Sequence, residues 1–401
     1  MALATPPLSL YVHFPWCVRK CPYCDFNSHT LHGELPVAAY LEALSADLDA
    51  QCAALQGREL VSVFMGGGTP SLFPPAAIES LLSRVRARLV LPPQAEITLE
   101  ANPGTIERGR FAEYRAAGVT RVSLGAQSFG GAQLAALGRI HSADETRVAA
   151  EELHHAGLHN FNLDLMVGLP EQDAAAAMAD VRAAVALEPA HISHYALTLE
   201  PGTVFGSLPP PGLPDDDQAA DMHESCQDAL ARAGYQRYET SAYAKAGQCC
   251  VHNLNYWQFG DYLGIGAGAH GKRTNAVSGR IERTTREREP RRYIARGAHG
   301  LVNAQVIRES ELPFEFMMNA LRLIEGFESS LYEARTGLPI GGIAARLERL
   351  CTRGLIETTQ QTWRPTAGGA RFLNEALLEF MEVPRAARPG VSRKTSDSVD
   401  T

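Results

Sequence analysis

The stretch that decides the fold is residues 13–27, which read His13-Phe14-Pro15-Trp16-Cys17-Val18-Arg19-Lys20-Cys21-Pro22-Tyr23-Cys24-Asp25-Phe26-Asn27. Its three cysteines, Cys17, Cys21 and Cys24, have the spacing C-x3-C-x2-C. Thiolates are soft ligands that suit iron–sulfur clusters and zinc. A cubane cluster usually takes one cysteine for each of its four irons. Three cysteines in one tight loop therefore predict a [4Fe–4S] cluster in which one iron stays open for another ligand.

A structural zinc site is the alternative that these cysteines leave open. Its fourth ligand would be His13 or His29. Arg19 and Lys20 lie between the cysteines and would help to keep thiolates deprotonated in either kind of site.

The remaining cysteines do not form a disulfide framework. Of the eight in the chain, five lie outside the cluster stretch: Cys52, Cys226, Cys249, Cys250 and Cys351. Scattered cysteines beside one tight group are typical of a reducing compartment and a single metal site.

Short apolar segments alternate with segments of helical periodicity through the first 240 residues. This alternation predicts six βα units with parallel strands and right-handed crossovers. The expected fold class is therefore α/β, a partial (β/α)6 barrel. The predicted strands are Leu8–His13, Leu60–Met65, Glu96–Glu100, Arg121–Leu124, Asn160–Met166 and His191–Leu199. The predicted helices are Ala38–Leu55, Ala76–Leu89, Thr146–Ala156, Ala174–Leu187 and Ala219–Ala233.

Polar residues follow the C-terminal ends of these strands, where barrels of this kind place their chemistry. The second strand ends in Gly66-Gly67-Gly68-Thr69-Pro70, and the third ends at Glu100. The fourth leads to Gln127, and the fifth contains Asp164. Because independent strands bring polar groups to the same end, we expect one shared site there.

We expect three structured parts and a tail. Residues 1–240 form the predicted barrel core, and residues 241–310 form a linking region. Residues 311–384 predict a mostly helical, winged-helix-like domain with a helix, a hairpin and a helix. This segment has ten Glu and seven Arg but neither Asp nor Lys, a charge of −3, which favours a structural or docking role over DNA binding. Residues 385–401 have few apolar side chains and predict a disordered tail.

The composition is that of a soluble globular protein, with 45% hydrophobic and 20% charged residues. No apolar stretch is long enough for a transmembrane helix. A secretory signal has a basic residue before its apolar run, and here no basic residue precedes the first apolar run. We therefore expect a cytoplasmic protein. The net charge of −8 disfavours a nucleic-acid partner.

The cysteine loop resembles the signature of the radical-SAM superfamily, and Gly66–Pro70 resembles its glycine-rich motif. This resemblance implies that S-adenosylmethionine (SAM) binds the open iron and that a reductant supplies the cluster with electrons. The likeness narrows to oxygen-independent coproporphyrinogen III oxidase and its relatives, and it covers nearly the whole chain. The residues that resemble the SAM contacts of that family are Tyr11, Gly67, Gly68, Thr69, Glu100, Gln127, Arg139 and Asp164.

The chemistry of these residues is compatible with that assignment. Carboxylates can accept hydrogen bonds from ribose hydroxyls or an ammonium group, and Arg139 can pair with the carboxylate of SAM. Each polar residue taken alone can equally be a satisfied surface or supporting group.

Two features differ from the oxidase pattern. The oxidases continue their motif to C-x3-C-x2-C-x-C, whereas Phe26 stands at the last position here. The oxidases also carry an extension before the first strand, whereas Tyr11 lies close to the start of this sequence. Both differences disfavour decarboxylase activity.

A third feature is the segment His252-Asn253-Leu254-Asn255-Tyr256-Trp257, which resembles the H-N-x-x-Y-W motif of HemW-type heme chaperones. An imidazole such as that of His252 can ligate heme iron. Tyr256 and Trp257 offer flat faces for stacking. These three residues are the predicted heme contacts, on a semi-open surface. The alternative is a turn in which the aromatic side chains belong to the core.

The resemblance thus implies a heme chaperone that binds heme and transfers it to acceptor hemoproteins, including membrane-associated ones. It would carry a [4Fe–4S] cluster and SAM, and a homodimer is compatible with it. The alternatives are a coproporphyrinogen III oxidase and another radical enzyme that acts on a tetrapyrrole. Whether the chain is an enzyme stays open at this stage.

Overall fold

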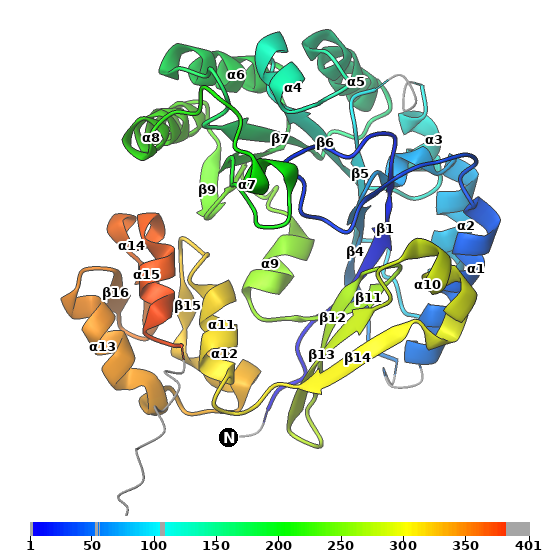
Figure 1. Ribbon diagram of the computed structural model, residues 1–401. Coiled ribbons are helices and arrows are strands. Elements are labelled where there is room, and N and C mark those ends of the chain that lie inside the picture. The colour runs from blue at the N-terminus through cyan, green and yellow to red at the C-terminus, as the bar shows by residue number, and fades with distance from the viewer. Residues whose placement is uncertain (1–2, 53–54, 56, 105–108, 382–401) are drawn as a thin grey trace, which may run out of the picture.

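A computed structural model describes residues 3–52, 55, 57–104 and 109–381 (Figure 1). The predicted tail, residues 385–401, lies outside the described residues. No helix in the described part of the chain is long and apolar enough to cross a membrane.

A twelve-stranded sheet forms the centre of the molecule, in the order β14-β13-β12-β11-β1-β4-β5-β6-β7-β8-β10-β9. The strands from β1 to β8 in this order pair in parallel. They are β1 (Leu8–Phe14), β4 (Leu60–Gly67), β5 (Glu96–Ala101), β6 (Arg121–Gln127), β7 (Phe161–Val167) and β8 (His191–Ala196). All six predicted strands are present, and most of their residues are buried, as expected for parallel strands covered on both faces.

Helices follow these strands and lie on the outer face of the curved sheet (Figure 1). The five predicted helices are confirmed as α1 (Val37–Cys52), α2 (Pro75–Arg86), α5 (Ala143–His155), α6 (Ala174–Ala186) and α8 (Asp216–Arg232). Two more, α3 (Phe111–Ala116) and α4 (Gly131–Ala136), are too short for periodicity to predict. The predicted α/β barrel fold is therefore confirmed.

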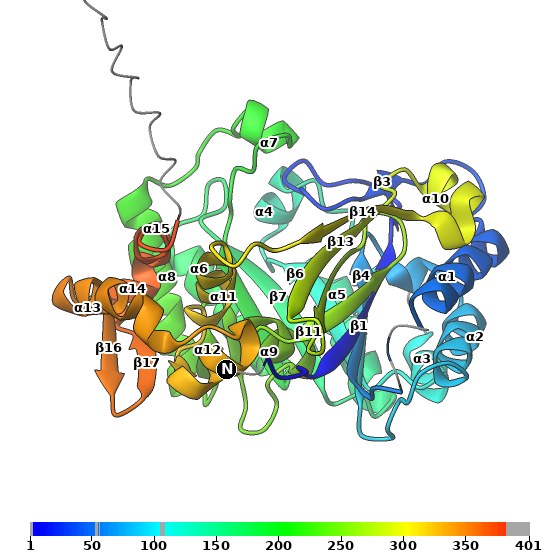
Figure 2. The same ribbon diagram turned by 90° about the horizontal axis from the view of Figure 1, so that it is seen from below.

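Residues 241–310, predicted to link two parts, extend the same sheet on both of its sides together with β9, which lies just before them. Strands β9 (Gln236–Glu239) and β10 (Ala242–Ala244) continue it beyond β8. Strand β11 (Asp261–Ile265) pairs in parallel with β1, on the side opposite β4. Antiparallel strands continue from β11 (Figure 2): β12 (His270–Asn275), β13 (Arg280–Arg286) and β14 (Leu301–Val306). Two helices interrupt the segment, α9 (Val251–Trp257) and α10 (Pro290–Arg296). The division of the chain into domains remains a prediction.

The C-terminal elements lie beside the open side of the barrel, next to α9 (Figure 1). They pack around a second apolar core that includes Phe316, Tyr332 and Leu347 and that also takes in Phe259 and Ile281. The predicted order of helix, hairpin and helix is present from α13 onward. The elements are α11 (Leu312–Ala320), β15 (Phe327–Glu328), α12 (Ser329–Thr336), α13 (Ala344–Thr352), β16 (Ile356–Thr359), β17 (Thr362–Pro365), α14 (Ala367–Arg371) and α15 (Leu373–Leu378).

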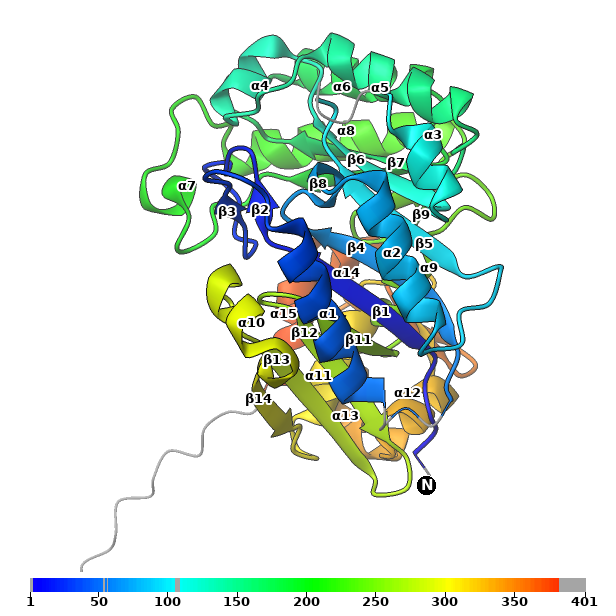
Figure 3. The same cartoon turned by 90° about the vertical axis from the view of Figure 1, so that its right-hand side faces the viewer.

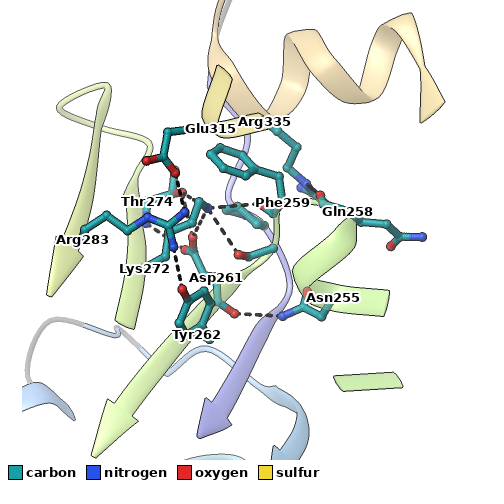
Figure 4. Close-up of polar contacts among 12 residues, drawn as sticks. Asn255, Gln258, Phe259, Asp261, Tyr262, Lys272, Thr274, Arg283, Glu315 and Arg335 are labelled. Atoms are coloured by element: carbon teal, nitrogen blue, oxygen red, sulfur yellow. Dashed lines mark hydrogen bonds and ion pairs between the residues drawn. The ribbon is translucent and has the colours of Figure 1, made fainter. Parts of the chain in front are cut away.

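A buried polar network holds the turn between α9 and β11 (Figure 4). The Lys272 ammonium donates to the carbonyl oxygens of Phe259 at 3.0 Å and Gly260 at 3.3 Å, and to the Asp261 carboxylate at 3.1 Å. Asp261 also accepts from Arg58 at 2.9 Å. Phe259 has a positive φ of 55°, which is unfavourable for a bulky residue, so this network maintains a strained turn.

The same turn joins the sheet to the C-terminal elements. The ring of Phe259 packs edge-on against Phe316 of α11, with ring centroids 5.7 Å apart. Arg335 of α12 donates to the Gln258 carbonyl oxygen at 3.2 Å. The position of α9 is therefore tied to both parts of the structure.

Candidate cofactor pocket

A cavity of about 230 Å³ lies at the C-terminal ends of the parallel strands. The loop after β1 and the ends of β4, β5, β6 and β7 contribute to its lining, so the strands meet at one site as expected from the sequence. All of the predicted cluster and SAM residues except Tyr11 line it: Cys17, Cys21, Cys24, Gly67, Gly68, Thr69, Glu100, Gln127, Arg139 and Asp164.

The cysteine loop is held in a defined conformation. Strand β2 (Trp16–Cys17) pairs with β3 (His29–Thr30), which returns the chain to the start of the loop. The Lys20 ammonium donates to the carbonyl oxygens of Phe26 and Ser28, both at 3.1 Å. Lys20 therefore closes the loop through its backbone, a role that the sequence alone did not indicate.

The three cysteines differ in their surroundings. Burial raises the pKa of the Cys17 thiol to about 11, although the Thr69 hydroxyl donates to its sulfur at 3.5 Å. An Arg139 N–H lies 3.7 Å from the sulfur of Cys21. Because the Cys17 thiol favours its protonated form, a bound metal is needed to stabilise its thiolate.

The arrangement of donors suits a cluster better than a single zinc ion. Within the described residues, no three His, Cys, Asp or Glu side chains converge closely enough to hold one metal ion. A cluster does not need such convergence, since each thiolate binds its own iron. The zinc alternative with His13 also fails on hydrogen bonding, because His13 Nε2 bonds the Asn27 carbonyl oxygen at 2.9 Å and Nδ1 bonds Tyr11.

Glycine is required at the end of β4 and just after it, because β1 and the residues that follow it approach the backbone closely there. Gly67 has a φ of +108°, and a Cβ there would lie 2.3 Å from the His13 ring. A Cβ on Gly68 would lie 2.6 Å from the Trp16 carbonyl oxygen. The Gly67 N–H donates to the Glu100 carboxylate at 2.9 Å. These glycines let the loop pack tightly while its backbone lines the cavity.

Two largely buried carboxyl groups, those of Glu100 and Asp164, face the cavity. Burial raises the pKa of Glu100 to about 7, and the nearby Asp164 adds to this effect. Burial also raises the pKa of Asp164, despite hydrogen bonds from Asn162 at 2.8 Å and Ser123 at 3.2 Å. A ligand with positive charge would stabilise both carboxylates, so this end of the cavity suits a cation.

Arg139 lies on the cysteine side of the cavity. One of its terminal nitrogens donates to Asn102 Oδ1 at 2.5 Å and to the Gly125 carbonyl oxygen at 2.8 Å. Its Nε is buried and has no hydrogen-bond partner within the described part of the chain. A buried donor without a partner is costly, and a ligand carboxylate would satisfy it.

Gln127 adopts a left-handed backbone conformation that is uncommon for residues other than glycine. Its φ is +63°, and the pairing of β6 with β7 shifts register just before it. Its side-chain oxygen accepts from the Tyr195 hydroxyl at 3.1 Å. The next residues are fixed by Asp180, which accepts from Ser128 Oγ and the Phe129 N–H, both at 2.7 Å.

The supporting residues Asn102, Ser123, Asp180 and Tyr195 were not identified from the sequence. Asn102 lies in the stretch Leu99-Glu100-Ala101-Asn102-Pro103, next to a predicted site residue, which was the one available signal. The others come from separate segments and meet the site only through the fold.

Tyr11 lies just outside the lining of the cavity. Its hydroxyl is hydrogen-bonded to His13 Nδ1 at 2.9 Å, and its ring stacks on Phe64 at 6.4 Å. Burial and the proximity of Glu100 raise its pKa, so Tyr11 stays neutral near the carboxylate end of the cavity.

The expectation that His252 occupies a semi-open surface is wrong. The H-N-x-x-Y-W segment forms helix α9, which packs against β1, β4 and β11. His252 is 1% exposed, and its two ring nitrogens are hydrogen-bonded to Ser62 Oγ at 2.8 Å and to the Tyr256 hydroxyl at 2.9 Å. Burial lowers the pKa of His252 to about 3. The imidazole is therefore neutral and has no free nitrogen for iron in this conformation.

The rest of α9 is also held by the protein. Glu96 accepts from the backbone N–H of His252 at 3.0 Å and from the Cys250 thiol at 3.4 Å. The Arg322 guanidinium lies 4.3 Å above the Trp257 ring. The side chains of the H-N-x-x-Y-W segment thus have packing roles within the protein. The assignment of this segment to heme binding remains a prediction.

Comparison with known proteins agrees with this geometry. The profile of the radical SAM superfamily matches residues 11–182, and that of the HemN C-terminal domain matches residues 307–372. The heme chaperone HemW of Escherichia coli (strain K12) is 51% identical over 376 residues, which cover 94% of this chain and 98% of that protein. The chain belongs to the HemW family. HemW of Haemophilus influenzae is 47% identical, with the same coverage.

More distant relatives extend the likeness. The bovine radical S-adenosyl methionine domain-containing protein 1, mitochondrial, is 32% identical over 93% of this chain and 87% of that protein. The solved structure of E. coli coproporphyrinogen III oxidase (HemN) has a TM-score of 0.79 at 21% identity, covering 94% of this chain and 90% of that one. This likeness shows that the HemW family member shares the HemN fold. Membership of the radical SAM superfamily implies a [4Fe–4S] cluster and SAM as cofactors.

Proposed function

We propose that this HemW family member is a heme chaperone, which binds heme and transfers it to acceptor hemoproteins while carrying a [4Fe–4S] cluster and SAM. The observation that carries the proposal is the cavity in which three cysteines meet Arg139 and the carboxyl groups of Glu100 and Asp164. The name shared by the E. coli and H. influenzae relatives supports the chaperone part of the proposal.

Cys17, Cys21 and Cys24 are the proposed cluster ligands. When bound, the cluster supplies one-electron reduction of the ligand on its open iron. The protein contributes the hydroxyl of Thr69, which donates toward Cys17, and an N–H of Arg139, which lies near Cys21. Such donors around the sulfur atoms stabilise the thiolate forms and tune the cluster.

SAM is the proposed occupant of the rest of the cavity. Its carboxylate would satisfy the free Nε of Arg139, and its positively charged groups would lie toward Glu100 and Asp164. The cavity thus has a positive end at Arg139 and a negative end at Glu100 and Asp164. SAM has a carboxylate for the first and positively charged groups for the second.

Coproporphyrinogen III oxidation is the second candidate function, because the fold is shared with HemN. A shared fold does not imply a shared reaction. Phe26 stands where the oxidase motif has its last cysteine, and its side chain is 58% exposed at the cavity. We therefore favour the chaperone.

Iron and sulfide analysis tests the cluster assignment. Anaerobically reconstituted protein should contain about four iron and about four sulfide per chain. Cys17→Ala, Cys21→Ala and Cys24→Ala should each abolish cluster assembly, whereas the controls Cys52→Ala and Cys351→Ala should retain it. Stoichiometric zinc without labile sulfide would refute the assignment.

A turnover assay separates the two candidate functions. Coproporphyrinogen III should remain unchanged when cluster-loaded protein, SAM and reductant are all present. Sustained decarboxylation under these conditions would favour the oxidase.

A further inference from the structure

The mouth of the cofactor pocket is surrounded by exposed apolar side chains. Val18, Phe26 and Ile140 line the cavity and are 42%, 58% and 62% exposed. Single exposed apolar residues are ordinary, but a group of them around one cavity marks an interaction site. We call these three residues the apolar rim.

The backbone that presents Phe26 is rigid. Its carbonyl oxygen accepts from Lys20 at 3.1 Å and from the Ser28 N–H at 2.7 Å. The next residue, Asn27, donates to the carbonyl oxygens of Ala267 and Arg288, both at 2.9 Å. The backbone from which the Phe26 ring projects is therefore fixed.

Ile140 is presented from the other side of the mouth by a loop that is fixed against the cysteines. A Cβ on Gly138, whose φ is +68°, would lie 3.0 Å from Pro22. The adjacent Arg139 contacts Cys21, as described above. The two loops that carry the apolar rim are thus locked to each other around the opening.

The mouth also carries a free positive charge. Arg19 lines the cavity, is exposed, and forms no hydrogen bond or ion pair with any residue that the structure describes. An apolar rim beside an unpaired guanidinium suits a flat apolar ligand that bears carboxylates. Heme, with its macrocycle and propionates, has this chemistry.

We propose that heme binds on the apolar rim, with its macrocycle against Phe26, Val18 and Ile140 and a propionate toward Arg19. This assignment rests on the proposed chaperone function and places heme over the cofactor cavity, away from α9. The assignment also gives a role to Phe26, which stands where the oxidase motif has its last cysteine. An exposed phenyl ring offers the macrocycle a stacking surface that a thiol lacks.

Heme titration of reconstituted full-length protein, followed by absorbance, tests the proposal. Phe26→Ala and Ile140→Ser should each weaken heme binding by about tenfold, the effect of losing one buried apolar side chain. Iron and sulfide content and the thermal unfolding midpoint should stay at wild-type levels, which shows that the variants fold. Val277→Ser is the matched control, because Val277 is 95% exposed in the turn between β12 and β13.

The propionate contact has a separate test. Wild-type protein should bind heme more tightly than heme dimethyl ester, which lacks the carboxylates. Arg19→Gln should remove this preference while leaving the affinity for the ester unchanged. An Arg19→Gln variant that keeps the full preference for free heme would overturn this part of the proposal.

The outcomes distinguish this site from the function on which it rests. Wild-type protein that shows no saturable heme binding would contradict the chaperone function itself. Saturable binding that is unaffected by Phe26→Ala and Ile140→Ser, but is lost in Trp257→Ala, would overturn the rim and place heme at α9.

Discussion

Arg139 connects the proposed cluster and SAM sites, because its guanidinium contacts Cys21, Asn102 and the Gly125 backbone and keeps one buried N–H free. Arg139→Ala should weaken SAM binding by about 1.5–3 kcal/mol, the value of a hydrogen bond to a charged group. Arg139→Lys should recover only part of this loss, since lysine lacks the planar fork. Equilibrium dialysis with labelled SAM would measure both effects.

The control for this prediction is Arg364→Ala, which removes a guanidinium from an exposed pair with Glu357 in the C-terminal hairpin. Its SAM affinity should equal that of wild-type protein. An Arg139→Ala variant with unchanged SAM affinity would remove Arg139 from the site.

Glu100 should make the stability of the ligand-free protein depend on pH. Its pKa rises from 4.5 in the unfolded chain to about 7 in the folded protein. The folded state therefore binds the extra proton more tightly, and this stabilisation is complete below pH 4.5 and is lost as pH rises through about 7. The loss should be at most about 3 kcal/mol, and smaller in practice because the side chain borders an open cavity.

Urea unfolding at about pH 4 and about pH 8, which lie below and above this transition, would measure the loss. Glu100→Gln should show a weaker decline in the free energy of unfolding between the two pH values. Glu113→Gln, on the outer helix α3, should decline as wild type does. If the free energy of unfolding of Glu100→Gln and of wild type fell by the same amount between the two pH values, the assignment of this pH dependence to Glu100 would be contradicted.

At the scale of elements, the turn between α9 and β11 depends on the buried Lys272–Asp261 pair, whose side chains are 1% and 0% exposed. Lys272→Met leaves Asp261 buried without one of its two cationic partners and frees the carbonyl oxygens of Phe259 and Gly260. Removing one partner of a buried ion pair costs about 3–5 kcal/mol. Denaturant unfolding should therefore show a loss of this size.

The neighbouring pair Arg273–Glu282 provides the matched control, because it also starts from β12 but joins it to β13, and its side chains are about one-third exposed. Arg273→Gln should cost about 0–1 kcal/mol, the usual value for a surface pair. If Lys272→Met cost no more than Arg273→Gln, the network would not hold the turn.

The elements also show where sequence reasoning succeeded and where it failed. Six strands of the large sheet were predictable, because parallel strands buried on both faces have continuous apolar runs. These strands are β1, β4, β5, β6, β7 and β8. Strands β12 and β13, with sequences such as Arg280–Arg286, are polar and partly exposed, so they gave no such signal. The parallel pairing of β11 with β1 joins residues about 250 positions apart, as for Leu8 and Asp261, and no local pattern encodes it.

The same distinction applies to the candidate site. Cys17, Cys21 and Cys24 could be grouped because they are neighbours in the sequence, and Glu100 and Asp164 could be grouped because they lie at equivalent ends of parallel strands. His252 was placed wrongly because a motif does not show which face of a helix packs against the sheet. That orientation depends on Ser62, Phe64 and Glu96, which belong to β4 and β5.

At the scale of the whole molecule, the sheet curves around a cavity that opens at the strand ends, and α9 and the C-terminal elements lie on the open side of the barrel (Figure 1). Seen from the side of α1, the C-terminal elements lie behind β1 and β11 (Figure 3). This fold is shared with HemN, so the fold alone does not decide between chaperone and oxidase. The decision depends on the cavity mouth, where Phe26 stands in place of the last cysteine of the oxidase motif and is exposed together with Ile140.

The most direct test of the account is an anaerobic heme titration of the cluster-loaded protein in the presence of SAM, followed by gel filtration to remove loosely held heme. The account predicts saturation at about one heme per chain, with the heme retained on the column together with the cluster. Heme that adds without saturation, or that separates completely from the protein on the column, would contradict the claim that this chain is a heme chaperone.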